Sequence, residues 1–95
     1  MSSIAINLPT ELTIAQVEEF KSTVLDLIAQ QDEISINDSD IIRIDTTGLQ
    51  LIVAIIIYVL SLNKTLVWQC SASCILESIK KLGINEPILN QYLPH

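Results

Sequence analysis

The sequence predicts a small α/β domain in which helices pack on a mixed or mainly parallel sheet of about four strands. Short segments with apolar residues at every second position alternate with longer segments whose apolar residues recur at every third or fourth position. The chain has 95 residues, of which 49% are hydrophobic, and this is the size and composition of one domain with its own core. We therefore expect residues 1–95 to form a single domain.

The first strand is expected over Ser3–Leu8, where isoleucine and leucine alternate with small or polar residues. A helix follows, because Thr13 and Gln16 fit a capping box, and Leu12 and Val17 fit a hydrophobic staple across it. This helix should end near residue 31, and its apolar stripe should lie on the sheet. The stripe consists of Val17, Phe20, Val24, Leu27 and Ile28.

Two further strand segments enclose a polar turn. Glu33–Asn37 has two isoleucines in alternation with polar residues, and Ile41–Ile44 is a short apolar segment. Residues 37–40 lie between them and contain two carboxylates. We predict a turn here and not a calcium loop, because a calcium loop needs more ligands at fixed spacing and a glycine.

A polar corner leads from this segment into a helix that is almost wholly apolar. The corner consists of Asp45, Thr46, Thr47 and Gly48. The free N–H groups and the positive dipole end of a helix start favour a carboxylate or a phosphate, although Asp and Thr also occur there simply as caps. The apolar run over residues 51–60 is shorter than the roughly 20 residues that cross a bilayer. A buried helix is therefore expected, and membrane insertion is not.

The long helix has more apolar surface than one sheet can cover. One side is assigned to the sheet and consists of Leu49, Ile52, Val53, Ile56, Val59 and Leu60. A second row, roughly opposite, consists of Leu51, Ile55, Tyr58 and Leu62. A neighbouring helix of the same domain can cover this row. If the row is uncovered, Leu51, Ile55 and Tyr58 are expected to serve partner binding or self-association.

The C-terminal third predicts one more strand and two helices. The strand is expected over Thr65–Cys70, and Ser71 or Ser73 is expected to cap the next helix. Gly83 is well placed as a left-handed cap, and Pro87 can open a last short helix. The apolar face of the longer helix consists of Ile75, Leu76, Ile79 and Leu82, and Ile84 is expected to fold back on Ile79.

The charge distribution limits the partners. The net charge of −6 argues against binding to nucleic acid or to an anionic membrane surface. Residues 1–45 hold nine acidic and two basic residues, whereas residues 46–95 hold two acidic and three basic ones. The acidic half is expected to be a solvated surface or a docking face for a basic partner.

No set of residues suited to catalysis, metal binding or cofactor binding stands out. His95 is the only histidine, Cys70 and Cys74 have no further ligand beside them, and Gly48 and Gly83 form no phosphate-binding loop. We therefore predict a protein that is not an enzyme and that holds no metal or cofactor. The N-terminus lacks the basic run and apolar core of a secretory signal, so a cytoplasmic protein with reduced thiols is expected.

The corner also carries a family resemblance. DTTGLQL, preceded by Ile42 and Ile44, resembles the Asp-Ser/Thr-Ser/Thr/Ala-Gly-Leu signature of STAS domains, the bacterial anti-sigma factor antagonists and their relatives. LTIAQVEEFKSTVLDLI and ILESIKKLGI match the pattern of small STAS proteins, including chemotaxis-associated ones, so the resemblance runs from about Leu12 to Leu89. It implies a STAS-like domain. Family members usually have a longer N-terminal hairpin, whereas this chain has room for one strand before Pro9.

The resemblance implies a regulatory binding protein. In anti-sigma factor antagonists, a Ser/Thr kinase phosphorylates the hydroxyl residue before the motif glycine, and phosphorylation ends binding to the partner. By this resemblance Thr47 is the acceptor, and Asp45, Thr46 and Gly48 join it in the partner-binding site. The expected partners are an anti-sigma factor, or a Ser/Thr kinase with a phosphatase. We also expect Gly48 to admit a partner's backbone or phosphate at close range.

A second STAS function stays open from the sequence. The chain can instead be a constitutive STAS subunit, such as the one that docks on the ATPase of bacterial phospholipid-transport ABC complexes. Such a subunit would use the same corner and helix as a static docking surface. It would not be phosphorylated.

Overall fold

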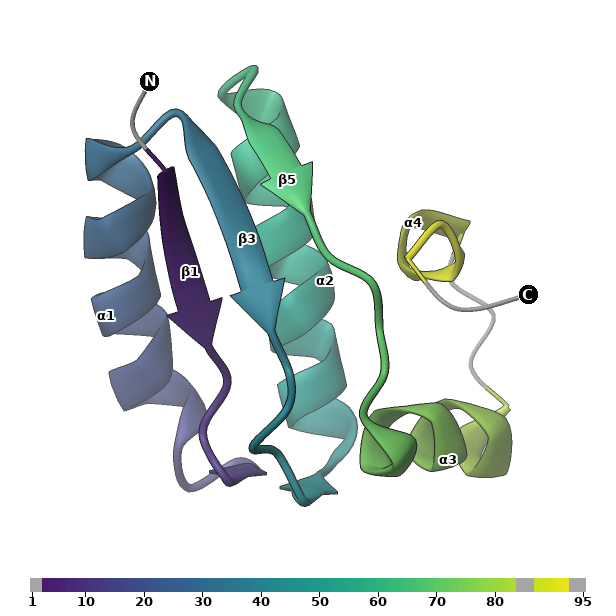
Figure 1. The fold of residues 1–95 in the computed structure, drawn as a ribbon. Helices are drawn as coiled ribbons and strands as arrows, with labels where there is room; N and C mark the ends of the chain where they lie inside the picture. The colour runs from purple at the N-terminus through teal and green to yellow at the C-terminus, as the bar shows by residue number, and fades with distance from the viewer. Residues whose placement is uncertain (1–2, 84–86, 93–95) are drawn as a thin grey trace.

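The computed structural model describes residues 3–83 and 87–92, which form a small α/β domain, as the sequence predicts. Strands and helices follow one another along most of the chain (Figure 1). Their order and bounds are β1 (Ser3–Asn7), β2 (Glu11–Leu12), α1 (Val17–Gln30), β3 (Glu33–Asn37), β4 (Arg43–Ile44), α2 (Thr46–Ser61), β5 (Thr65–Val67), α3 (Ser73–Leu82) and α4 (Pro87–Asn90).

The main sheet has three strands in the order β1-β3-β5, and both pairings are parallel. Ile34 in the central strand is aligned with Ile4 on one side and Leu66 on the other. A second, two-stranded parallel sheet joins β2 to β4 and aligns Leu12 with Ile44. Because parallel neighbours need a crossover connection, α1 links β1 to β3 and α2 links β3 to β5. Every strand pairing among the described residues is parallel.

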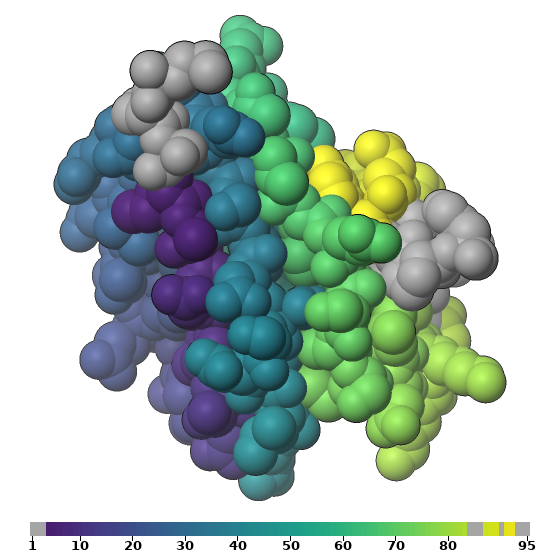
Figure 2. Space-filling model, in the orientation of Figure 1, coloured from purple at the N-terminus to yellow at the C-terminus, as the bar shows by residue number. Residues whose placement is uncertain are grey.

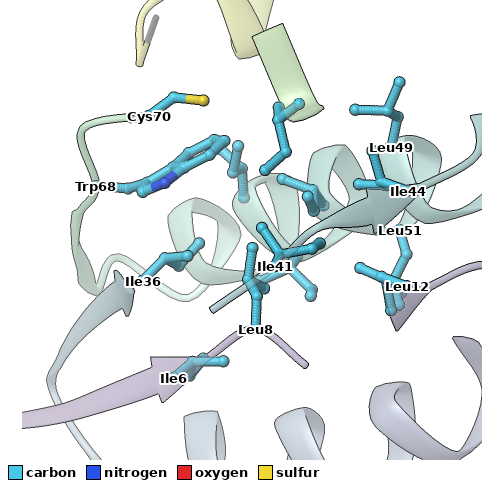
Figure 3. Packing of buried hydrophobic residues seen from close by; sticks show 14 of the residues in the cluster. Ile6, Leu8, Leu12, Ile36, Ile41, Ile44, Leu49, Leu51, Trp68 and Cys70 are labelled. Carbon is cyan, nitrogen blue, oxygen red and sulfur yellow. The ribbon is translucent and has the colours of Figure 1, made fainter. Parts of the chain in front are cut away.

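Both crossover helices lie on one face of the main sheet, and α3 and α4 lie beyond β5 (Figure 1). The core lies between the sheet and these helices. In Figure 3, Leu8 and Ile41 point into the cluster, which Trp68 and Cys70 border on one side and Leu12 and Ile44 on the other. The opposite face of the sheet is turned toward the viewer in Figure 2, and atoms of β1, β3 and β5 lie open on it. That open face is why the strands alternate apolar and polar residues.

The start of α1 confirms one of the two hydrogen bonds of the predicted capping box, because the Thr13 hydroxyl donates to Gln16 and does not accept a helix N–H. The side-chain oxygen Oε1 of Gln16 accepts hydrogen bonds from the Thr13 N–H at 2.9 Å and from the Thr13 hydroxyl at 2.6 Å. Regular helix begins only at Val17, because residues 13–16 first form a turn closed by the Thr13 carbonyl. At the other end, the Lys64 ammonium donates to the Ile28 carbonyl, which satisfies a backbone acceptor in the last turn.

The strand predicted over Thr65–Cys70 is shorter than expected. It ends at Val67, so the prediction of a strand up to Cys70 is wrong for its second half. The Cys70 N–H donates to the Tyr92 carbonyl at 2.9 Å, outside any ladder of the main sheet. Trp68 is buried and stacks on the Tyr92 ring at a centroid distance of 5.8 Å. The C-terminal segment therefore draws this part of the chain away from β3.

The start of α3 is held by a distant carboxylate and not by the predicted serine caps. Ala72 is the cap residue and provides no side-chain cap. Asp38 Oδ2 accepts from the backbone N–H groups of Ser71 at 2.9 Å and Ala72 at 3.1 Å. The Ser71 hydroxyl donates to Oδ1 at 2.8 Å, and Trp68 Nε1 donates to Oδ2 at 3.4 Å. Burial acts to raise the pKa of Asp38, but these hydrogen bonds outweigh it and lower the pKa.

Three of the sequence predictions concern residues at helix ends. Leu60 and Leu82 are exposed, contrary to expectation, because each lies in the last turn of a helix, where the chain turns away from the core. Gly83 has a φ of 67°, which confirms its left-handed cap. The contact predicted for Ile84 lies outside the described residues.

Replacing Asp38 should destabilise the domain. In Asp38→Ala the buried N–H groups of Trp68 and Ala72 lose their acceptor, and we expect a loss of about 3 kcal/mol in the free energy of unfolding. Urea unfolding of the variant measures it. Asp40→Ala is the matched control, because this nearby carboxylate is exposed, and it should stay within about 0.5 kcal/mol of wild type. Equal effects of the two changes would contradict the anchoring role of Asp38.

Candidate functional site

The polar corner is built around the Asp45 carboxylate. Asp45 caps α2 in an extended conformation, and its Oδ1 accepts from the Gly48 N–H at 2.9 Å. Its other oxygen, Oδ2, accepts from the Ile14 N–H at 2.9 Å, in the turn that leads into α1. One side chain thus joins the starts of two crossover helices through a hydrogen bond between residues that are 31 positions apart in sequence.

The same hydrogen bonds keep Asp45 ionised. The bond from the Gly48 N–H has the largest effect and lowers the pKa of Asp45, burial opposes it, and the N–H groups of Ile14 and Thr47 lower it further. The carboxylate therefore already occupies the positive end of the α2 dipole. Asp45 therefore acts as a helix cap, which is one of the two roles that the sequence allowed for the corner.

Gly48 is held against the chain's own backbone. It is buried, and a Cβ at this position would lie 2.1 Å from the Leu12 carbonyl oxygen and 2.8 Å from Ile44 Cγ1. The close backbone approach expected at Gly48 is therefore present, but it comes from β2 and not from a partner. The space around Gly48 is filled within the domain.

The two threonines of the corner differ in exposure. Thr46 is exposed, whereas Thr47 is half-buried and lines an open pocket of about 210 Å³ between α1 and α2. The structure therefore brings Asp45, Thr46, Thr47 and Gly48 together, with the glycine buried, Asp45 and Thr47 half-buried and Thr46 exposed.

Two exposed isoleucines flank the corner and were not predicted as site residues. The exposed fractions are 72% for Ile14 and 75% for Ile42, the highest of the large apolar residues in the described chain. Ile14 donates its N–H to Asp45, and Ile42 precedes Asp45 by three residues. One feature of the sequence could have indicated that Ile14 is exposed, because Ile14 lies outside the apolar stripe of α1. Both apolar side chains are therefore open to solvent.

The second apolar row of α2 is mostly covered. Leu51 and Ile55 are only 8% and 5% exposed, because α1 lies beside α2. For these two residues the structure shows the alternative of a row covered by a neighbouring helix, and the condition set for their partner-binding role is not met. Tyr58 and Leu62 remain partly exposed. A mainly apolar pocket of about 290 Å³ separates the two helices there. It is lined by Lys21, Leu25, Leu51, Ala54, Ile55 and Tyr58.

The two cysteines are poorly suited to nucleophilic chemistry. Burial is the main cause that raises the pKa of Cys70 to about 12, and burial also raises the pKa of Cys74. Both thiols are free and stay protonated near neutral pH. Within residues 3–83 and 87–92, no three or more His, Cys, Asp or Glu side chains are grouped as a metal site would require.

None of the helices in the described part of the chain combines the length and apolar character needed to cross a membrane.

Comparison with known proteins identifies the fold. Neither a family model nor a curated protein matches the sequence. Among solved structures, the chain is similar to the Bacillus cell fate determinant SpoIIAA in its phosphorylated form, with a TM-score of 0.68 and 16% identity over 98% of this chain and 81% of that one. It is also similar to the anti-sigma factor antagonist SpoIIAA in its unphosphorylated form, with a TM-score of 0.70 and 16% identity over 98% and 78%. The chain has the fold of a STAS domain, and the resemblance is confirmed at this level.

The two glycines should respond differently to the same substitution. Gly48→Ala places a methyl group against a backbone oxygen, and we expect a loss of about 3 kcal/mol in the free energy of unfolding. Gly83→Ala meets no atom within 4 Å and should cost only about 1 kcal/mol, from its left-handed backbone. Chemical unfolding of both variants measures the difference. A Gly48→Ala protein as stable as wild type would contradict the packing described here.

Stability should fall in acid because of Asp38 and Asp45. Both pKa values are lowered in the folded protein, so these groups contribute stability above the unfolded pKa of about 3.9 and lose it as the pH falls through that value toward the folded pKa. Unfolding midpoints measured from pH 6 down to pH 3 should therefore drop less in Asp45→Asn than in wild type. Asp26→Asn, at an exposed position of α1, should follow wild type. Parallel curves for all three proteins would contradict this assignment.

Proposed function

We propose that this protein is a non-enzymatic, cytoplasmic regulator of the anti-sigma factor antagonist type, switched by phosphorylation of Thr47. The observation that carries the proposal is the placement of Thr47. Its half-buried side chain lies in the first turn of α2, directly before a glycine that is fixed by packing and beside a carboxylate that is already bound internally. Thr47 can therefore be modified while the contacts that hold the corner remain.

The expected reaction is phosphoryl transfer by a partner Ser/Thr kinase. The γ-phosphoryl group of ATP forms a bond to Thr47 Oγ1, the hydroxyl proton leaves to a base of the kinase, and ADP is released. The protein gains about 1.5 to 2 negative charges at this point. A phosphatase that hydrolyses the ester restores the hydroxyl. The protein is a substrate in both steps and supplies no catalytic residue.

The surface around Thr47 suits a switchable protein contact. Ile14 and Ile42 offer exposed apolar side chains, Thr46 offers a hydroxyl, and all three lie at or beside the corner. A phosphate on Thr47 adds charge and bulk to this surface and would weaken a partner fitted to the hydroxyl form. SpoIIAA, which shares the fold, has been solved with and without phosphate, and this supports an analogous switch. The proposed partner is an anti-sigma factor or the kinase itself.

Peptide mapping of the protein isolated from its own cells tests the acceptor. We expect phosphate on Thr47, lost in Thr47→Ala and retained in Thr46→Ala, which removes the adjacent hydroxyl. Binding of the captured partner should weaken about tenfold or more when phosphothreonine replaces Thr47, since a like charge or clash of about 1.4 kcal/mol suffices for that factor.

Two outcomes would overturn the proposal. One is phosphate on Thr46 or Ser39 with none on Thr47. The other is a protein that carries no phosphate in cells and copurifies stably with a transporter ATPase, which would establish the constitutive docking subunit instead. Both threonine variants should unfold at wild-type denaturant concentrations, so that a lost signal cannot be ascribed to misfolding.

A further inference from the structure

Lys21 is a cation without a partner near the corner. It lies on the exposed side of α1, and within residues 3–83 and 87–92 its ammonium group makes no hydrogen bond or ion pair. The other basic residue of the acidic half, Arg43, faces Glu11 at 3.6 Å. Lys64 is bound to the Ile28 carbonyl, far from the corner in the fold. Within residues 3–45, Lys21 is thus the basic side chain that makes no ion pair or hydrogen bond.

The pocket between α1 and α2 places Lys21 and Thr47 on the same cavity. Its wall consists of Val17, Glu18 and Lys21 from α1, and Thr47, Gln50 and Leu51 from α2. The pocket has a volume of about 210 Å³ and opens to solvent. Since a water molecule takes up roughly 30 Å³ in the liquid, the pocket has the volume of several water molecules and is large enough for a phosphoryl group.

A phosphate on Thr47 needs a positive charge from outside α2. At most helix starts, free N–H groups and the dipole supply it, but here Asp45 already accepts from the Gly48 N–H and holds a negative charge two residues away. Glu18 adds a second negative charge on the pocket wall. Lys21 is the basic residue on that wall, and its long stem lets the ammonium group move toward the phosphate.

We propose that Lys21 is the counter-ion of phosphothreonine 47, so that phosphorylation joins α1 to α2 across this pocket. The inference rests on the proposed function, because it concerns the phosphorylated form. In this form the phosphate and Lys21 neutralise part of each other's charge, and Lys21 is withdrawn from the surface. The switch then changes the docking surface in two places, at the lost hydroxyl and at the lost free cation, while the fold is kept.

Phosphothreonine placed at position 47 during translation tests the inference without any kinase. The second ionisation of the phosphate is followed by phosphorus NMR in the full chain. A nearby cation favours the dianion, so Lys21→Met should raise the phosphate pKa by roughly 0.3 to 0.7 units, and the difference should shrink in 1 M salt. Met keeps the length of the apolar stem, and Lys21→Arg should restore the wild-type titration.

Lys80→Met is the matched control, because it removes the same charge from the exposed side of α3, away from this pocket. An unchanged phosphate titration in Lys21→Met would overturn the inference, and so would an equal shift in Lys80→Met, which would reflect net charge alone. Neither result bears on whether cells phosphorylate Thr47. Conversely, the absence of phosphate on Thr47 in cells would overturn the proposed function and leave this measurement unaffected.

Discussion

The arrangement of the domain depends on one carboxylate, that of Asp45. It accepts the Ile14 N–H with one oxygen and the Gly48 N–H with the other, each at 2.9 Å, and so fixes the turn before α1 to the start of α2. The Asp45 N–H in turn donates to the Leu12 carbonyl at 3.4 Å, the same oxygen that leaves no space for a Cβ at Gly48. The short β2–β4 pair therefore lies next to the starts of both crossover helices. A buried or half-buried carboxylate with several N–H donors is stable as an anion, so this joint holds at neutral pH.

A second carboxylate, that of Asp38, fixes backbone N–H groups in the same way at the other side of the core. Asp38 binds the backbone before α3 and the Trp68 ring nitrogen, as Asp45 binds the starts of α1 and α2. The turn before α1 and the start of α3 are therefore each held by a carboxylate that is distant in sequence, and α2 is held by its own cap residue, Asp45. Among the described residues, the side-chain hydroxyls of Thr46 and Thr47 take no part in these hydrogen bonds, although the Thr47 N–H helps to lower the pKa of Asp45. A phosphate-controlled contact requires such a division, because the modified residue must be free to change while its surroundings stay fixed.

The features that can be predicted from the sequence are those determined by residues close together in the chain. The strands β1 and β3, the helices α1 and α2 and the cap at Gly83 follow from periodicity and capping, since the residues involved are close in the chain. The corner itself was also predictable, because capping and the family motif fall on the same four residues. The features that were predicted wrongly depend on contacts between segments that are distant in the chain. The end of β5 is set by the hydrogen bond between Cys70 and Tyr92 and the start of α3 by Asp38, and no local pattern indicates these pairs. The sequence left open whether a neighbouring helix covers Leu51, and α1 does so.

Amide hydrogen exchange at Ile14 and Gly48 tests most directly whether one carboxylate joins the two helix starts. Both N–H groups should exchange more slowly than in an unfolded chain, and both should lose that protection together in Asp45→Ala. The Leu49 N–H provides the internal control, because it donates to the Asp45 backbone carbonyl at 3.0 Å, which the substitution keeps. If Ile14 exchanges freely in the wild-type protein, or if Gly48 alone responds to the substitution, Asp45 is an ordinary helix cap and the joint described here does not exist.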